Sequence, residues 1–394
     1  MIICRNLHKL RQNYDAIMIN LVRDLSDNIL KKLKPNKVVL VFGARRVGKT
    51  LLVKEILAKV NEPVLILNGE DINVHDKLAI RSVENYKQIL GTYKLLYIDE
   101  AQKIPEIGEK LKLMIDEIDG LKIIISGSSS FDIHKDAGEP LTGRKYTFNL
   151  YTFSENEYNQ IENSISKIDK LSERLVFGNY PELLHLPDRD DKIDYLNEMI
   201  SSYLLKDILV YEHIKNSQKI FNLLRLVAFQ IGGEVSLQEL GKQLGISKNT
   251  VEKYLDLLNK VFILHKVEGF SRNLRKEITK NSRWYFLDNG IRNAVIANFN
   301  PVHARNDIGA LWENYMISER LKYQSYKRIS SNNYFWRTYE QQEIDWVEER
   351  DGSLFGYEFK WKEDKFKIPT QWKSAYPGAS FELINVNNFN EWLK

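Results

Sequence analysis

A glycine-rich loop near the N-terminus carries the residues with the most specific chemistry. It reads Gly43-Ala44-Arg45-Arg46-Val47-Gly48-Lys49-Thr50 and lies between an apolar run at residues 38–42 and a helical pattern that includes Leu51. This is the strand–loop–helix context of a phosphate loop. The two glycines let backbone amides turn inward around a phosphate, and the start of the helix directs its positive end at the same anion. The lysine is placed for the β- and γ-phosphates and the threonine hydroxyl for Mg²⁺, so we predict that residues 43–51 bind a nucleotide.

Two later apolar runs end in polar residues that complete such a site. The run at residues 94–98 is followed by Asp99 and Glu100. We expect Asp99 to hold Mg²⁺, directly or through water, and Glu100 to polarise the attacking water. The run at residues 121–125 ends in a serine-rich stretch in which Ser126 or Ser128 is a candidate sensor of the γ-phosphate. An ordinary serine-rich turn is the alternative for that stretch.

Strands and helices alternate around these motifs. The hydrophobic pattern predicts strands at 38–42, 64–67, 94–98 and 121–125, and helices at 14–34, 76–90 and 105–118. Alternation of this kind, with polar residues at the carboxyl ends of strands, predicts an α/β fold with a parallel sheet and a site at that edge. Helical periodicity from residue 154 to about 227 predicts a helical lid on that sheet.

Residues 233–264 have the pattern of a helix-turn-helix. Ser236 and Ser247 are placed to cap two helices, and Gly245 turns the chain between them. Apolar residues at 262–264 and 284–287 flank a basic stretch and predict the strands of a wing. The second helix exposes residue types that contact phosphates and base edges, namely Lys248, Asn249, Thr250 and Lys253. DNA contact and a packing or dimerisation role are both open for this segment.

Acidic residues and a lysine gather where the C-terminal strands are predicted. We expect a helix over residues 307–327 and strands over 334–338, 343–347 and 354–361. Period-two alternation puts Glu358 and Lys360 on one face of the last strand, and Asp345 lies on the preceding strand.

These residues resemble the PD-(D/E)xK nuclease core. In that core two carboxylates hold Mg²⁺, which activates a water, and the lysine steadies developing negative charge. The resemblance makes Asp345, Glu358 and Lys360 the candidate site, with Glu313 on the preceding helix as an additional acid. Ile344 stands where the core has proline, and an ordinary solvated strand with alternating charges is the alternative.

Nearly the whole chain resembles the AAA-type ATPases that carry a family-specific C-terminal region of unknown function. The resemblance rests on GARRVGKT, LLYIDEAQ, SGSSS, LTGRKYTF and LYTFSENEY, and further on FGNYPELL, YLDLLNKVFIL, WYFLDNGIR, GALWENYM, EIDWV and YEFKW. It implies ATP rather than GTP as the nucleotide, with Mg²⁺ as the cofactor. Arg144 matches a recurring glycine–arginine of that family, which makes it a candidate for stabilising charge on the γ-phosphate. Pairing with an acid of its own domain is the alternative for Arg144.

The chain of 394 residues is long enough for several domains. We expect a P-loop ATPase domain at 1–152, a helical lid at 153–228, a winged helix-turn-helix at 229–300 and a small restriction-endonuclease-like α/β domain at 301–394. The formal net charge of +4 permits DNA binding without requiring it. A single cysteine, Cys4, and the lack of an apolar run of membrane-spanning length predict a cytoplasmic protein with no membrane partner.

These patterns favour a Mg²⁺-dependent ATPase that binds or acts on DNA through its winged helix and nuclease-like domain. The main alternative is a nucleotide-gated signalling switch whose nuclease-like domain is an inactive scaffold. A small-molecule kinase is a weaker alternative, because it leaves the C-terminal modules without a role. The expected ligands are ATP or ADP, Mg²⁺ and DNA. The oligomeric state is open, with a homo-oligomer among the alternatives.

Overall fold

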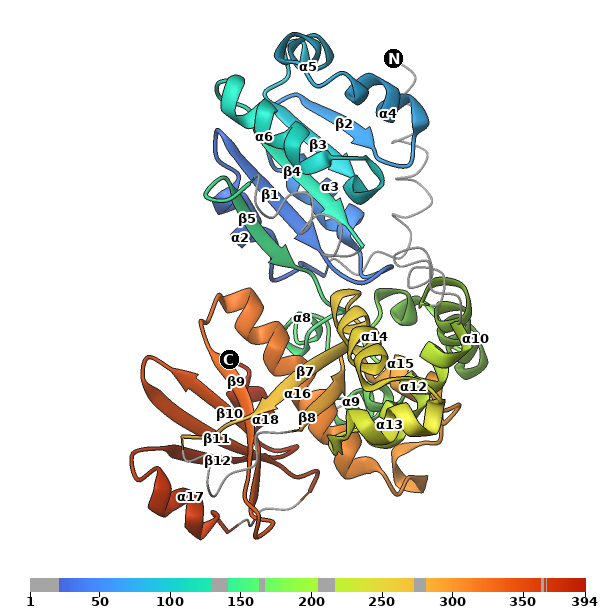
Figure 1. Ribbon diagram of the computed structural model, residues 1–394, viewed down its shortest axis with the longest axis vertical. Helices are drawn as coiled ribbons and strands as arrows, with labels where there is room; N and C mark the ends of the chain where they lie inside the picture. The colour runs from blue at the N-terminus through green and yellow to red at the C-terminus, as the bar shows by residue number, and fades with distance from the viewer. Residues whose placement is uncertain are drawn as a thin grey trace.

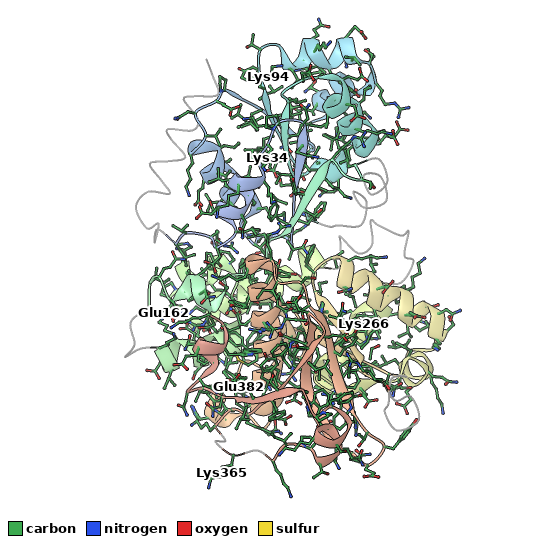
Figure 2. All side chains as sticks on the ribbon, turned by 90° about the vertical axis from the view of Figure 1, so that its left-hand side faces the viewer. Lys34, Lys94, Glu162, Lys266, Lys365 and Glu382 are labelled. Carbon is green, nitrogen blue, oxygen red and sulfur yellow. The ribbon has the colours of Figure 1, made fainter. Side chains whose placement is uncertain are left out.

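Two sheets organise the chain, one in each of two lobes that are stacked along the long axis of the molecule (Figure 1). The computed structural model describes residues 21–128, 141–162, 167–204, 217–272, 281–362, 365 and 367–394. The N-terminal lobe holds the described residues up to 152 and the C-terminal lobe holds the rest. Figure 2 shows the lobes from the side, with Lys34 and Lys94 in the N-terminal lobe and Lys266 and Glu382 in the C-terminal lobe.

The N-terminal sheet is parallel, as the sequence predicts. Its five strands are β1 (Lys37–Phe42), β2 (Val64–Asn68), β3 (Leu95–Asp99), β4 (Lys122–Gly127) and β5 (Lys145–Asn149), in the order β2-β3-β4-β1-β5. Every neighbouring pair in this sheet is parallel. Because β4 lies between β1 and β3, the end of β4 lies beside both the phosphate loop and the acidic end of β3. This order places three chain segments at one edge of the sheet.

The helices of the N-terminal lobe differ from the sequence prediction in two places. They are α2 (Ser26–Lys32), α3 (Lys49–Ala58), α4 (Ile72–Ala79), α5 (Val83–Leu90) and α6 (Ile107–Glu117), with a 3-10 turn η1 (Ala101–Lys103). The single helix expected at 76–90 is two helices, because Ile80 is extended and the Ser82 side chain caps α5 through the Asn85 amide. The helix expected at 14–34 begins only at Ser26 within the described residues, since the main chain of residues 22–24 bonds to side chains of the following lobe.

A helical segment follows the first sheet, as expected. It comprises α8 (Glu155–Tyr158), α9 (Lys167–Phe177), η2 (Pro181–His185), α10 (Arg189–Glu198), the π-type turn η3 (Met199–Leu204) and α12 (Ser217–Phe229). Apolar residues of β1 and α3 share one buried cluster with residues of α10 and α12, among them Val41, Val53, Leu196 and Val227. The hydrophobic core therefore continues from one lobe into the other.

The second sheet runs through the whole C-terminal lobe. Its strands are β6 (Glu234–Val235), β7 (Leu264–Gly269), β8 (Ser282–Phe286), β9 (Asn332–Arg337), β10 (Glu343–Arg350), β11 (Ser353–Phe359) and β12 (Ser380–Ile384), in the order β12-β11-β10-β9-β7-β8-β6. The parallel pairing of Glu268 with Tyr334 and of Gly269 with Phe335 joins β7 to β9. Residues 229–300 and 301–394 thus contribute strands to one sheet.

The remaining helices flank this sheet. They are α13 (Leu237–Leu244), α14 (Lys248–Lys260), α15 (Asn289–Val295), the 3-10 turn η4 (Val302–Ala304), α16 (Ile308–Lys327), α17 (Thr370–Ala375) and α18 (Phe389–Trp392). The two helices predicted around Gly245 are present, and Gly245 has the left-handed backbone that ends α13. None of the helices in the described part of the chain is long and apolar enough to span a membrane.

We predict that Gly178 is indispensable to the packing of α9 against α15. Its φ is +79°, and a Cβ there would lie 1.9 Å from Asp288 Oδ1 and 2.7 Å from the Gly290 nitrogen. Gly178→Ala is therefore expected to lower the free energy of unfolding by about 3 kcal/mol or more, measured by urea denaturation. Gly91→Ala is the control, because Gly91 also has positive φ but open space around it; it should cost about 1 kcal/mol. Equal losses would contradict the steric account.

Candidate nucleotide-binding site

The phosphate loop lies between β1 and α3 at the carboxyl edge of the parallel sheet, as predicted. Gly48 precedes α3 with φ of +94°, a conformation that favours glycine. A Cβ on Gly43 would lie 2.1 Å from the Leu150 carbonyl oxygen, so only glycine fits at that position. The loop is therefore held in shape by a turn at one glycine and by close backbone packing at the other.

Lys49 is folded back over the loop. Its side chain is buried, and Nζ donates to the carbonyl oxygens of Gly43 at 3.0 Å and Ala44 at 2.8 Å. An ammonium held over the loop is within reach of phosphates bound by the loop amides. Arg46 is exposed and its guanidinium lies 5.9 Å from the ring centre of Tyr195 on α10, so the loop also contacts the C-terminal lobe. Leu51 is 47% exposed on α3.

Thr50 and Asp99 meet at the centre of the site. Thr50 Oγ1 donates to Asp99 Oδ2 at 2.8 Å, and the Ser126 hydroxyl donates to Asp99 Oδ1. The Tyr97 hydroxyl lies 2.9 Å from Ser126 Oγ, and burial together with the charge of Asp99 raises the pKa of Tyr97 well above its ordinary value. A hydroxyl and a carboxylate oxygen side by side fit the few protein ligands that Mg²⁺ takes beside nucleotide phosphates.

Glu100 is held by a residue that sequence reasoning missed. Gln102 Nε2 donates to Glu100 Oε2 at 2.5 Å and to Ser128 Oγ at 3.1 Å, so one amide links the predicted water-activating acid to the predicted phosphate sensor. Glu100 has φ of +48° and precedes η1, the turn that brings Gln102 back beside it. The position of Gln102 two residues after Glu100 is the only sequence clue to this contact.

Residues 35–159 match the AAA domain family. The site therefore lies within the part of the chain that matches the AAA domain family. Two further family models match the C-terminal lobe: domains of unknown function DUF8612 at residues 168–302 and DUF4143 at residues 308–382.

Uncharacterized relatives resemble most of the chain. The uncharacterized protein Rv2008c of Mycobacterium tuberculosis is 24% identical over 341 residues, covering 86% of this chain and 73% of its own length. The uncharacterized protein MJ1544 of Methanocaldococcus jannaschii is 24% identical over 336 residues, covering 80% of this chain and 73% of its own length. These similarities extend across both lobes.

Solved structures resemble the chain weakly. A mutant RuvB of Thermotoga maritima is 16% identical, with a TM-score of 0.29. The matched region covers 63% of this chain and 89% of the RuvB chain. A Signal Transduction ATPase with Numerous Domains from Pyrococcus horikoshii is 12% identical, with a TM-score of 0.30. The matched region covers 75% of this chain and 44% of the Pyrococcus chain. These TM-scores are too low to carry over a domain arrangement.

Arg144 does not lie beside the phosphate loop of its own chain. It precedes β5, whose first residue pairs with Val38 near the start of β1, so Arg144 is at the opposite edge of the sheet from the loop. Arg144 Nε lies 2.5 Å from Asp116 Oδ1 at the end of α6. The geometry agrees with the alternative in which Arg144 pairs with an acid of its own domain.

The acids predicted for the C-terminal lobe gather around an arginine from β8. Arg283 Nη1 lies 3.6 Å from Glu313 Oε1 and 3.8 Å from Asp345 Oδ1, and Nη2 lies 2.8 Å from Glu343 Oε2. Glu358 is buried beside this cluster, where Lys360 Nζ lies 3.0 Å from Glu358 Oε1. The structure therefore brings the predicted residues into one region and adds a buried cation that the sequence analysis did not anticipate.

This acid cluster does not fit a divalent metal ion. No group of three or more His, Cys, Asp or Glu side chains in the described ranges could hold a metal, and Arg283 already supplies positive charge. Burial, followed by the charge of Asp345, raises the pKa of Glu313 and of Glu358 to about 8. Metal ligands must be ionised, and burial opposes the ionisation of both carboxyls. Glu358 Oε2 has no partner among the described residues, which a protonated carboxyl tolerates better than a carboxylate.

The residues predicted to contact DNA lie on α14. Lys248, Asn249 and Lys253 are exposed, whereas the Thr250 amide and hydroxyl bond to Ser247 Oγ at 3.1 and 2.8 Å and form the helix cap. Of the basic residues predicted for a wing, Arg272 pairs with Glu349 at 2.8 Å. Three other basic residues predicted for the wing lie outside the described residues: Arg275, Lys276 and Lys280. The same is true of two serines of the predicted sensor stretch, Ser129 and Ser130.

Arg283 is expected to be the counter-ion on which the acid cluster depends. Arg283→Leu should lower the free energy of unfolding at neutral pH by about 3–5 kcal/mol, because removing one partner leaves buried acids unpaired. Arg272→Leu, which removes the exposed pair with Glu349, should cost less than about 1 kcal/mol. Urea denaturation compares the two variants. Similar losses in both would show that Arg283 does not neutralise the cluster.

Proposed function

We propose that the chain binds ATP with Mg²⁺ at the phosphate loop and hydrolyses it, and that the C-terminal lobe binds DNA through α14. The observation that carries the ATPase proposal is the contact between Thr50 and Asp99, with Glu100 as the next residue. Thr50 lies at the start of α3, which follows β1, and Asp99 ends β3; β1 and β3 are not neighbours in the sheet, yet the two side chains meet beside a loop shaped for phosphate. The choice of ATP over GTP rests on the similarity to the AAA domain.

Each residue of the site has a distinct task in this proposal. The loop amides and Lys49 bind the phosphates and stabilise the charge that develops during transfer. Thr50 and Asp99 would hold Mg²⁺, which would neutralise phosphate charge. Glu100 accepts a proton from the attacking water, and Gln102 fixes its orientation through the 2.5 Å bond. Ser128, bonded to the same amide, is placed to respond to the γ-phosphate.

DNA binding is supported by the exposed basic and amide side chains at the start of α14. Lys248, Asn249 and Lys253 are types that contact phosphates and base edges. Cleavage of DNA is not part of the proposal, because Arg283 stands among the acids that would have to hold the metal.

A nucleotide-gated switch is the second candidate function. It is favoured by the pairing of the acid cluster with Arg283, which would leave the C-terminal lobe as a scaffold without cleavage activity. It is also favoured by the contact between Arg46 of the phosphate loop and Tyr195 of the C-terminal lobe. In this alternative the ligand of the C-terminal lobe is a protein rather than DNA.

We expect wild-type protein to release phosphate from ATP in the presence of Mg²⁺ and Lys49→Ala to do so at least about 100-fold more slowly, since the variant loses the cation on the transferred phosphoryl group. Lys54→Ala is the matched control, because Lys54 is exposed on the same helix. A coupled phosphate-release assay measures all three proteins. Equal rates in wild type and Lys49→Ala would contradict the ATPase proposal.

The same assay with added DNA tests the role of α14. Duplex, single-stranded and branched DNA should raise the rate, and the double variant Lys248→Glu/Lys253→Glu should remove the stimulation because it reverses the charge facing the phosphates. Stimulation should also fall with increasing salt. A wild-type rate that none of the three DNA forms changes would favour the switch.

A further inference from the structure

Arg23 links the phosphate loop to the junction between the lobes. The side chain is 6% exposed, and its guanidinium lies 4.7 Å from the ring centre of Phe153. Its Nη1 donates to the Val47 carbonyl oxygen at 2.7 Å, Nη2 to the Tyr151 carbonyl at 2.7 Å, and Nε to Glu157 Oε1 at 2.9 Å. One buried cation thus contacts the loop, the exit from β5 and the first helix of the next lobe.

The Val47 carbonyl, which accepts from Arg23, and the Gly48 amide belong to the same peptide group. In a planar trans peptide the carbonyl oxygen and the amide hydrogen point in opposite directions. Arg23 holds the carbonyl end of this group, and the amide end belongs to the loop whose N–H groups bind phosphate. A guanidinium on one end and a phosphate on the other polarise the same group in the same direction, so each contact strengthens the other.

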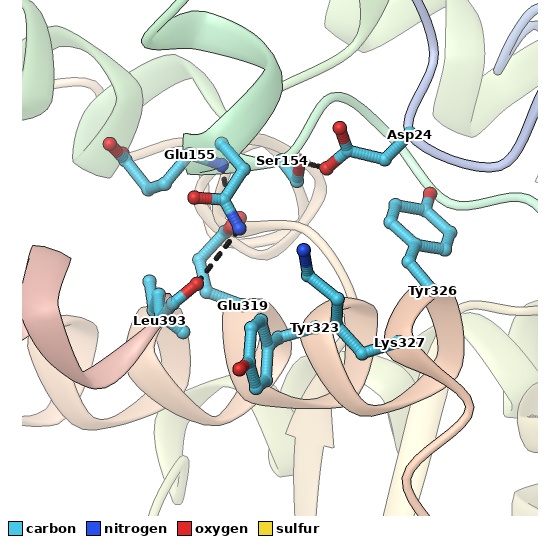
Figure 3. A pocket seen from close by; sticks show the side chains of 9 residues that line it. Asp24, Ser154, Glu155, Glu319, Tyr323, Tyr326, Lys327 and Leu393 are labelled. Carbon is cyan, nitrogen blue, oxygen red and sulfur yellow. Dashed lines mark hydrogen bonds between the residues drawn. The ribbon is translucent and has the colours of Figure 1, made fainter.

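The residues on either side of Arg23 are also bonded to α8 and to the turn that follows it. The Asp24 amide donates to the same Glu157 oxygen at 2.9 Å, and the Val22 amide donates to Gln160 Oε1 at 3.0 Å. Ser154 Oγ donates to Asp24 Oδ2 at 3.3 Å beside a pocket between the two lobes, which Asp24, Tyr326 and Lys327 line (Figure 3). Burial, and then the charge of Glu157, raise the pKa of Asp24 to about 6.

From α8 the bonded path continues into the C-terminal lobe. The Glu155 amide donates to Glu319 Oε2 on α16 at 2.8 Å (Figure 3). Asn156 Nδ2 donates to the Leu393 carbonyl at 2.8 Å. Arg320, the next residue on α16, donates through Nη1 to the Trp392 carbonyl at 2.7 Å. Direct bonds therefore connect the back of the phosphate loop with the last helix of the chain.

We propose that Arg23 is a positioning residue for the phosphate loop and transmits nucleotide occupancy to the C-terminal lobe. The inference rests on the proposed nucleotide site. Phosphate binding at the Gly48 amide strengthens the hydrogen bond from the Arg23 guanidinium to the Val47 carbonyl. The guanidinium then adjusts its hydrogen bonds to Glu157 and Tyr151. The position of α8 against α16 and α18 changes in response.

The tryptophans of the chain provide a reporter for this movement. All 7 lie at residue 284 or later, so the N-terminal lobe contains none. A change in tryptophan fluorescence on nucleotide binding therefore reports on the C-terminal lobe. Trp392 packs against Tyr357 and Arg320 beside the end of the bonded path, which makes it sensitive to a shift of α18.

The experiment titrates full-length protein with ADP and with a non-hydrolysable ATP analogue, each with Mg²⁺. Calorimetry measures occupancy and tryptophan fluorescence measures the response at saturation. Wild type is compared with Arg23→Lys, which keeps the charge but loses the planar fork, and with Glu157→Gln, which keeps the shape of the partner. Arg81→Gln is the matched control, because Arg81 is a half-exposed arginine of the same lobe, paired with Glu106 at 3.6 Å.

The expected result is a fluorescence change in wild type and Arg81→Gln that falls about five-fold or more in Arg23→Lys and Glu157→Gln at full occupancy. A full response in both junction variants at full occupancy would overturn the proposal. So would saturation of wild type by calorimetry without any change in fluorescence, although the nucleotide site would then stand. If wild type bound neither nucleotide, the proposed function would fail as well, and the two failures are distinguished by the calorimetric trace.

Discussion

The close approach of Gly43 to the carbonyl of Leu150 is the constraint on which the nucleotide site and the lobe junction both depend. The Leu150 amide also donates to the Phe42 carbonyl at 2.6 Å, so the start of the phosphate loop and the end of β5 are fixed to each other. The next residue, Tyr151, offers its carbonyl to Arg23, which also holds Val47 at the far end of the loop. The residues that lead from β5 into the C-terminal lobe therefore also fix the shape of the phosphate loop.

Buried charge follows the same logic in both lobes. Arg23 and Arg283 are each surrounded by oxygens from distant parts of the chain, which offsets the cost of removing a guanidinium from water. In the N-terminal lobe the guanidinium holds the Val47 carbonyl of the phosphate loop. In the C-terminal lobe the arrangement brings a cation among the acids that the sequence analysis predicted as metal ligands.

Local motifs explain what could be predicted from the sequence. The phosphate loop, the acids after β3 and the parallel sheet follow from residue types at fixed spacing and from hydrophobic periodicity, and all three are present. The helix expected at 76–90 was wrong because the cap at Ser82 outweighs the continuing periodicity. Gln102 was missed because its role depends on the turn that follows Glu100.

Long-range contacts explain what could not be predicted. Arg23 and Glu157 are 134 residues apart, and no periodic pattern connects them. Arg283 reaches Glu343 across 60 residues because β7 joins the strands on either side of residue 300 into one sheet. A single sequence contains no record of such pairs, because they form only when distant parts of the chain are brought together.

Calorimetric binding of ATP with and without Mg²⁺ tests the central claim most directly, with Asp99→Asn compared against wild type. The account predicts that Mg²⁺ tightens ATP binding to wild type and that this gain is lost in Asp99→Asn, because the amide cannot replace the carboxylate beside Thr50. An equal effect of Mg²⁺ in both proteins would contradict it, since the contact between Thr50 and Asp99 would then not form the centre of the nucleotide site.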